Sequence, residues 1–258
     1  MASSYQNSPQ RGNVNNHLSL RSANPALSSK TFQNLSASSG EAMTVNGTVN
    51  KIGISLAILL FFAYITFTRE ITGLIFVGLI GGLILALVTM FKKHLSPITV
   101  PIYAALEGLM LGGISFIFNE LYEGIVFQAI SLTLGILFSL LFAYKTGLIK
   151  ATENFKLGVA AATGGIFIVY MLSFVMSFFG SGLAIMDVNN SSLFSIGFSL
   201  LVVVIASLNL VLDFDFIEEG SERGAPKYME WYGAFGLLVT LIWLYIEILH
   251  LLAKLRSR

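Results

Sequence analysis

The pattern of apolar and polar positions divides the chain into a polar first part and a long series of apolar runs. Each run has close to the roughly 20 residues that an α-helix needs to cross about 30 Å of hydrocarbon. We predict membrane-spanning helices at residues 52–68, 71–91, 98–119, 124–145, 157–179, 194–219 and 229–253. The sequence therefore predicts an all-α polytopic membrane protein, a bundle of seven transmembrane helices.

Residues 1–50 are rich in Ser, Asn, Gln and Gly and hold few large apolar side chains. Such a segment cannot bury enough apolar surface to offset its loss of conformational entropy on folding. The first apolar run begins only at Ile52, too late for the core of a cleaved secretory signal. We therefore predict a disordered polar tail over residues 1–50, retained in the protein, and a seven-helix transmembrane domain over residues 51–258.

Lys and Arg in the predicted loops indicate the orientation, because cytoplasmic loops carry an excess of these residues. A cytoplasmic tail places most of them on that side: Arg11, Arg21, Lys30, Lys51, Lys92, Lys93, Lys145, Lys150, Lys156, Arg223 and Lys227. We expect a cytoplasmic N-terminus. Seven full crossings would put the basic C-terminus outside, against the rule, whereas a last segment that bends back would obey it. The sequence leaves both arrangements open.

Composition agrees with a membrane protein, since 55% of the residues are hydrophobic, 11% are charged and the mean hydropathy is +0.79. The net charge of +1 and the dispersed Lys and Arg offer no basic patch for nucleic acid. The chain has no Cys, and its three His are far apart, so thiolate and multi-histidine metal sites are not expected. We expect no cofactor and no enzymatic activity.

Small residues and a short connection predict how some helices meet. Small residues let helices approach closely within lipid, and we expect helix contacts at Gly108, Gly112, Gly158, Ala161, Ala162 and Gly165. The first connection is so short that the first two spans should form an antiparallel hairpin.

Four acidic residues lie in or near the apolar runs: Glu107, Asp213, Asp215 and Glu247. Asp215 points away from Asp213 and lies nearer the acidic loop Glu218-Glu219, so we expect it to be solvated at the interface. An ionisable carboxyl at the centre of a bilayer costs roughly 2.5–3.5 kcal/mol on insertion scales and usually lies on an ion or proton pathway. Glu107 and Asp213 lie at similar depths from the cytoplasmic end of their segments. Steps of three and four residues back from Asp213 give a small or polar stripe that suits an inward-facing seam: Asn209, Ala206, Val202 and Ser199.

Two arrangements of Asp213 and Glu247 are open. If they touch, one of the two carboxyls must keep its proton, and the shared proton holds the two helices together as a pH-gated latch. Once the proton is lost, the carboxylate oxygens are suitable ligands for Ca²⁺. Alternatively they are independent carboxyls. If the last span starts at Gly233, Glu247 lies about 21 Å deep, well beyond Asp213. Pairing then requires that this span start higher, tilt or bend.

Three motifs, in this order and spacing, resemble the Bax inhibitor-like, or transmembrane Bax inhibitor motif, family, in particular its bacterial subgroup. They are Ala104-Ala-Leu-Glu-Gly-Leu109, Leu210-Val-Leu-Asp-Phe214 and Trp243-Leu-Tyr-Ile-Glu-Ile-Leu249. The resemblance implies a seven-helix fold with a central last helix, acting as a pH-sensitive Ca²⁺ leak channel in the bacterial inner membrane. It also implies that Asp213 and Glu247 are the pH-sensing pair, with Lys92 or Lys93 as the basic partner of the latch.

The leading hypothesis is therefore a cation leak channel in which deprotonation of Asp213 and Glu247 loosens the bundle, with Glu107 lining or closing the path and Asn209 supporting Asp213. Its partners would be the lipid bilayer, Ca²⁺ and protons. A second hypothesis is a non-conducting membrane protein that binds other membrane proteins and regulates stress responses. A third is a proton-coupled carrier of a small solute.

Overall fold

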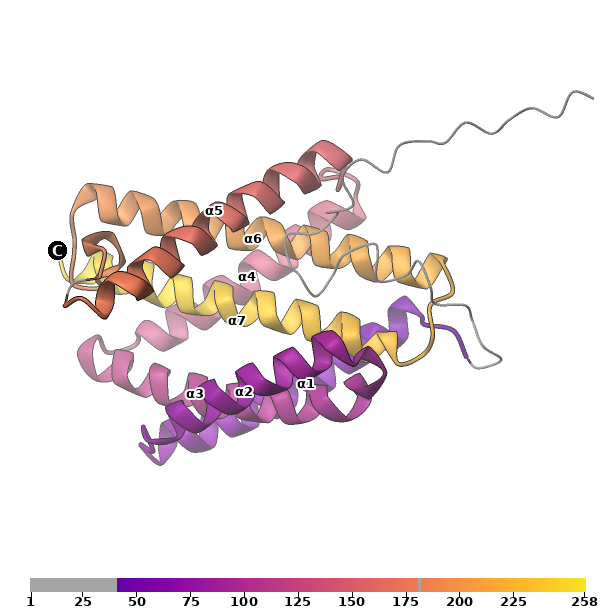
Figure 1. Cartoon of the computed structure of the whole chain (residues 1–258), viewed down its shortest axis with the longest axis horizontal. Coiled ribbons are helices and arrows are strands. Elements are labelled where there is room, and N and C mark those ends of the chain that lie inside the picture. Colours follow the sequence, from indigo (N-terminus) through magenta and orange to yellow (C-terminus); the bar gives the residue numbers. More distant parts are fainter. Residues whose placement is uncertain (1–40, 181) are drawn as a thin grey trace, which may run out of the picture.

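A computed structural model describes residues 41–180 and 182–258, and within them the chain forms seven helices that are long and apolar enough to cross a membrane (Figure 1). The predicted number of spans is confirmed. The helices are α1 (Val45–Thr68), α2 (Leu74–Phe91), α3 (Ser96–Leu121), α4 (Ile125–Lys145), α5 (Glu153–Ser177), α6 (Leu193–Glu222) and α7 (Met229–Arg256), with short 3-10 turns η2 (Lys93–Leu95) and η3 (Ala184–Met186).

The helix ends lie within four residues of the predicted spans, except at the start of α1. That helix begins at Val45, so residues 45–50, which were predicted to belong to the tail, are helical. Thr44 caps it, because its hydroxyl accepts a hydrogen bond from the backbone N–H of Gly47 at 2.9 Å. The predicted disorder of the rest of the tail falls on residues 1–40, which lie outside the described residues.

Helix α7 occupies the centre of the bundle, which confirms the expectation of a central last helix. It packs against α1, α3, α4 and α6 (Figure 1). Its large apolar side chains Phe235, Leu238, Leu244 and Ile248 are fully buried. Helix α5, in contrast, packs mainly on α6 at the edge of the bundle. Other helices therefore surround α7 on several sides.

Helix α3 lies against both α1 and α2, and its glycines allow this. A Cβ at Gly108 would come within 2.4 Å of the carbonyl oxygen of Leu59, and one at Gly112 within 2.3 Å of that of Ala63. The predicted contacts at these glycines are confirmed. The chain does reverse tightly over residues 69–73, as the hairpin prediction requires, but α1 and α2 pack far more extensively on α3 than on each other.

The predicted contacts of the small residues on α5 are wrong for its glycines. A Cβ at Gly158 or Gly165 would meet no atom within 4 Å, because α5 turns this face away from the bundle. Small-residue spacing shows that a close approach is possible, and only the arrangement of the neighbouring helices decides whether one occurs.

The two ends of the bundle carry different connections. The N-terminal segment meets the turn between α6 and α7, where the Met43 N–H donates to the Ala225 carbonyl at 2.6 Å. At the opposite end, the Arg256 guanidinium donates to the carbonyl of Glu123 at 2.7 Å. Helix α7 crosses the whole bundle as one continuous helix, so the C-terminus lies opposite the start of α1 (Figure 1). The predicted alternative of a last span that bends back is not what the structure shows.

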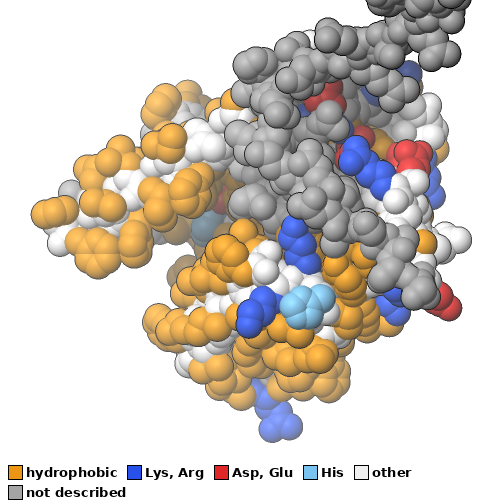
Figure 2. Space-filling view, turned by 45° about the vertical axis from the view of Figure 1, so that its right-hand side comes forward, with side chains coloured by type: hydrophobic (Ala, Val, Ile, Leu, Met, Phe, Trp, Pro, Cys, Tyr) orange, Lys and Arg blue, Asp and Glu red, His pale blue; other side chains and the backbone are white. Residues whose placement is uncertain are grey.

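The outer surface fits a lipid environment. Figure 2 shows apolar side chains over the flanks of the helices, while many Lys, Arg, Asp and Glu side chains gather at the end that faces the viewer. Large apolar side chains such as Phe76, Phe127 and Phe167 are exposed on α2, α4 and α5. The protein is therefore an integral membrane protein with hydrocarbon as the solvent of its flanks.

Candidate functional site

Asp213 lies at the contact between α6 and the central α7, nine residues before the end of α6, or about 14 Å from that end. Its side chain is fully buried, with a relative exposure of 0%. Neither of its carboxyl oxygens has a hydrogen-bond partner among the described residues. Buried polar groups are rarely left without partners, so this carboxyl is an unusual feature of the bundle.

The polar side chains near Asp213 are engaged elsewhere. Thr240 of α7 faces the carboxyl, but its hydroxyl donates to the carbonyl of Gly236 at 3.3 Å. Asn209, the predicted supporting residue, is buried, and its amide donates to the hydroxyl of Thr163 on α5 at 2.9 Å. Asn209 therefore joins α5 to α6 one turn before Asp213.

Glu247 is also buried, at 5% exposure, but it has partners. The hydroxyl of Tyr170 on α5 donates a short hydrogen bond to its Oε1 atom. The indole N–H of Trp243, one turn earlier on α7, donates to the same oxygen at 3.2 Å. These two bonds hold the carboxyl at the contact between α5 and α7.

The structure does not bring Asp213 and Glu247 together. Thr240 is the α7 residue that faces Asp213, and Glu247 lies seven residues further along the helix, or about 10 Å. Helix α7 runs from Met229 to Arg256 as one continuous helix, and the hydrogen-bond partners of Glu247 are Tyr170 and Trp243 rather than Asp213. The arrangement is that of two independent carboxyls at different depths.

Glu107 lies on α3 at a depth similar to that of Asp213. It is eleven residues, or about 17 Å, from Ser96, and the Ser96 hydroxyl donates to the carbonyl of Tyr228 at the same end of the bundle where α6 stops. Its side chain is 7% exposed and packs against Gly82 of α2, where a Cβ would meet the Oε1 atom at 2.4 Å. Its Oε2 atom has no hydrogen-bond partner in the described chain.

The two predicted latch lysines lie at the end of the bundle near the start of α3. Lys92 follows the last residue of α2 and is exposed. The ammonium of Lys93 lies 5.6 Å from the centre of the Tyr232 ring, a cation–π arrangement with α7. No ion pair joins either lysine to Asp213, Glu247 or Glu107 among the described residues.

A buried lysine near the other end of α7 was missed by the sequence reasoning. Lys254 is only 2% exposed, and its ammonium donates to the carbonyl of Ile185 at 2.7 Å and to the hydroxyl of Ser199 at 2.9 Å. These bonds tie α7 to α6 and to the connection that precedes it. The spacing held a signal, because Lys254 follows Glu247 by seven residues, two helical turns, and so shares its face.

Asp215 was expected to be solvated at the membrane interface, and its side chain is partly exposed, at 25%. Its carboxylate also forms an ion pair with Lys156 of α5 at 2.5 Å. Of the two nearby aspartates on α6, Asp215 therefore has a cationic partner, and Asp213 has none among the described residues.

The site consists of three buried carboxyls at three separate helix contacts. Each could offer oxygen ligands to a passing cation, but no three His, Cys, Asp or Glu side chains gather into a possible metal site in the parts of the chain that the structure describes.

The sequence was compared with known proteins. The profile of a family described as Bax inhibitor 1 like matches residues 24–257. No curated protein and no solved structure matches the chain.

Proposed function

Because the chain belongs to the Bax inhibitor 1 like family, we propose that it is a pH-sensitive leak channel for cations such as Ca²⁺, in which Asp213 is the group that responds to protons. The observation that carries this proposal is the fully buried carboxyl of Asp213 at the contact of α6 with α7, where neither oxygen has a hydrogen-bond partner in the part of the chain that the structure describes. The proposed function involves no catalysis.

In this proposal the structure is the closed state of the channel, in which Asp213 carries its proton. An ionised carboxylate in this position would lack a counter-ion and a hydrogen-bond donor, and burying such a charge costs far more than burying the neutral acid. When the pH rises and Asp213 loses its proton, the charge gains stability only if water or a cation reaches it. Separation of α6 from α7 would admit both, and carboxylate oxygens are the ligands that Ca²⁺ prefers.

Glu247 and Glu107 would act in series with Asp213, rather than as its hydrogen-bonded partners. Glu247 lies about 10 Å further along α7 than Thr240, toward the opposite end of the bundle. Glu107 lies near the depth of Asp213 on the neighbouring α3. A cation entering between the helices would thus meet acidic oxygens at two levels, which lowers the electrostatic cost of crossing.

The proposed orientation has the start of α1 on the cytoplasmic side. The same end carries the connections after α2, α4 and α6, which contain or adjoin Lys92, Lys93, Lys145, Lys150, Arg223 and Lys227. An excess of Lys and Arg in these short connections supports a cytoplasmic location. The resemblance to bacterial proteins favours the inner membrane of a bacterium.

The test is Ca²⁺ flux in proteoliposomes recorded as a function of pH. We expect wild-type flux to rise as the pH is raised, and flux through Asp213→Asn to lose this dependence because the amide cannot ionise. Glu222→Gln is the matched control, since it makes the same change of charge at an exposed position on the same helix. A wild-type pH profile in Asp213→Asn would refute the assignment of Asp213.

The alternatives correspond to other outcomes of the same experiment. Wild-type protein that passes no Ca²⁺ at any pH would overturn the channel and favour a non-conducting protein that binds membrane partners. Saturable uptake of a small solute driven by a proton gradient, without Ca²⁺ flux, would instead indicate a carrier.

A further inference from the structure

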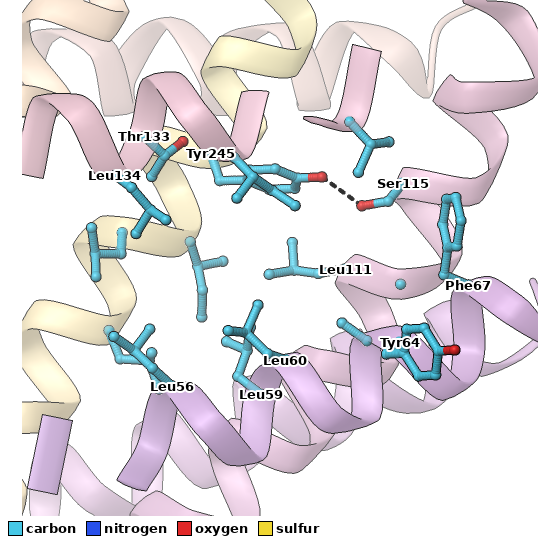
Figure 3. Close-up of a pocket in the computed structure, with 17 residues that line it drawn as sticks. Leu56, Leu59, Leu60, Tyr64, Phe67, Leu111, Ser115, Thr133, Leu134 and Tyr245 are labelled. Atoms are coloured by element: carbon cyan, nitrogen blue, oxygen red, sulfur yellow. Dashed lines mark hydrogen bonds between the residues drawn. The ribbon is translucent and has the colours of Figure 1, made fainter. Parts of the chain in front are cut away.

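A crevice of about 450 Å³ lies between α1, α3, α4 and α7 (Figure 3). Its walls are almost wholly apolar, with Leu60 of α1, Leu111 of α3, Leu134 of α4 and Leu241 of α7 among the lining side chains. Its volume falls within the range of roughly 300–1,000 Å³ that is usual for ligand sites. The crevice is separate from the three carboxyls, none of which lines it.

The wall holds few polar side chains, those of Tyr64, Ser115, Thr133 and Tyr245, and the last three already take part in hydrogen bonds within the protein. The hydroxyls of Ser115 and Tyr245 bond to each other across the crevice wall at 2.6 Å, as Figure 3 shows. The hydroxyl of Thr133 donates to the carbonyl of Ala129 at 2.8 Å within α4. The lining therefore selects an apolar occupant.

The crevice opens on the flank of the bundle. Helices α1 and α4 both pack on α3 and α7 but not closely on each other, and Leu60, Tyr64 and Leu134 are exposed at the gap between them. Since α1 and α4 are candidate membrane spans, this opening faces hydrocarbon rather than water.

We propose that this crevice binds one acyl chain of a membrane phospholipid. A helix from a second copy is about 10 Å wide with its side chains, which is too wide for a crevice of this volume, whereas an extended hydrocarbon chain is thin and flexible. The α1 lining residues run from Leu56 to Phe67, toward the end of α1 where Arg69 is exposed. The chain thus enters from the leaflet at that end, where Arg69 and Glu70 are both exposed, and its phosphate pairs with the Arg69 guanidinium.

The bound chain would touch the central helix directly. Leu238, Leu241 and Tyr245 of α7 line the crevice, and Tyr245 lies two residues before Glu247. An acyl chain would add van der Waals contacts on the side of these side chains that faces the crevice. A ligand that binds only the folded protein also stabilises it by mass action.

The test uses the full chain, purified in detergent and stripped of lipid, then titrated with phosphatidylglycerol while native mass spectrometry counts the bound lipids and thermal unfolding is followed. We expect one phospholipid to bind saturably and to raise the unfolding temperature. Glycerophosphoglycerol, the headgroup without acyl chains, should do neither. Headgroup binding of the same strength would overturn the assignment to an acyl chain.

Two substitutions fill the crevice, and each has a matched control on the same helix. Leu60→Trp and Leu134→Phe should abolish saturable lipid binding, whereas Ile54→Trp and Leu132→Phe, at exposed positions that do not line the crevice, should retain it. If one of the two crevice variants fails to fold, the other still tests the proposal. The proposal is overturned if the filled variants bind phosphatidylglycerol as the wild type does, or if the wild type binds none.

Crosslinking in native membranes tests whether a second copy of the chain occupies the crevice instead. The chain has no Cys, so Leu134→Cys introduces a single thiol at the mouth of the crevice. Efficient disulfide crosslinking between copies at this position, but not with Leu132→Cys, would show a dimer interface in place of a lipid site.

Discussion

At the scale of single residues, the acidic side chains in the membrane domain meet the cost of burial in different ways. Glu247 accepts hydrogen bonds from Tyr170 and Trp243, and Asp215 pairs with Lys156. Asp213 is as deeply buried as any of them and, among the described residues, has neither an ion-pair partner nor a hydrogen bond within 3.5 Å. A buried carboxyl with so little support for its charged form is the one most sensitive to its own protonation.

An apolar replacement of Asp213 should make the protein more stable. Asp213→Leu is expected to raise the free energy of unfolding by about 1–3 kcal/mol, because it removes a buried polar group that has no partner. Thermal unfolding in detergent measures this. A loss of stability would show that the carboxyl has a partner, such as a bound water or ion. Since the variant should also lose the pH-dependent flux, stability and function would change in opposite directions.

The hydrogen bond between Tyr170 and Glu247 should contribute measurably to the attachment of α5. Tyr170→Phe is expected to lower the free energy of unfolding by about 0.5–2 kcal/mol, the range for hydrogen bonds between membrane helices. In a Glu247→Leu background the same change should cost close to nothing, which a double-mutant cycle would detect. Tyr64→Phe, at an exposed position on α1, is the control. Equal costs in both backgrounds would contradict the bond.

At the scale of elements, the N-terminal segment binds the start of α7. The backbone N–H and the hydroxyl of Thr44 donate to the Glu230 carboxylate at 3.1 and 3.0 Å, and Met43 is buried beside Gly233. Lys227, in the turn between α6 and α7, pairs with the same carboxylate at 3.1 Å. One carboxylate thus joins the start of α1, the turn and the start of α7.

This junction should not respond to pH near neutrality. The hydrogen bond with Glu230 raises the pKa of Lys227 above its ordinary value of 10.5. The ion pair therefore contributes stability that is fully present below the unfolded pKa and is lost as the pH rises through the folded pKa. The difference in unfolding free energy between the wild type and Lys227→Met should be constant over roughly pH 6–9 and should shrink only above that range.

The Lys227→Met variant also distinguishes two possible sources of the pH dependence of the Ca²⁺ flux, Asp213 and the junction at Glu230. Lys227→Met should keep the midpoint of the flux profile, because Lys227 remains charged throughout the neutral range. A shifted midpoint would locate the pH response at the junction rather than at Asp213.

At the scale of the whole molecule, the position of the basic C-terminus has a structural explanation. Seven full crossings place Lys254 and Arg256 at the end opposite the start of α1, against the usual distribution of basic residues. Both are engaged within the protein, since Lys254 bonds to Ile185 and Ser199 and Arg256 bonds to Glu123 and Gln128. Their cationic groups therefore hold together the helix ends on that side of the bundle.

Single cysteines should report this topology directly. In intact cells, a membrane-impermeant maleimide is expected to label Arg258→Cys and not Thr146→Cys, which is exposed in the connection after α4 at the other end. Both should be labelled after the membrane is opened with detergent. Labelling of both positions from the same side in intact cells would mean that the last helix does not cross.

The sequence by itself determined the number of spans, most of their boundaries and the residues that carry charge inside the membrane. These follow from local properties, because about 20 apolar residues cross a bilayer whatever their neighbours are, and a carboxyl within such a run is visible at once. The close approach at Gly108 and Gly112 was predicted on the same basis, although the equivalent glycine spacing on α5 carries no contact.

Only the tertiary structure decided which carboxyl has a partner. The depth of Glu247 depends on where α7 starts and whether it bends, and its partner Tyr170 comes from a helix 77 residues away in the chain. Side-chain partners across helix contacts depend on the level and rotation of every helix in the bundle, and no local pattern specifies these.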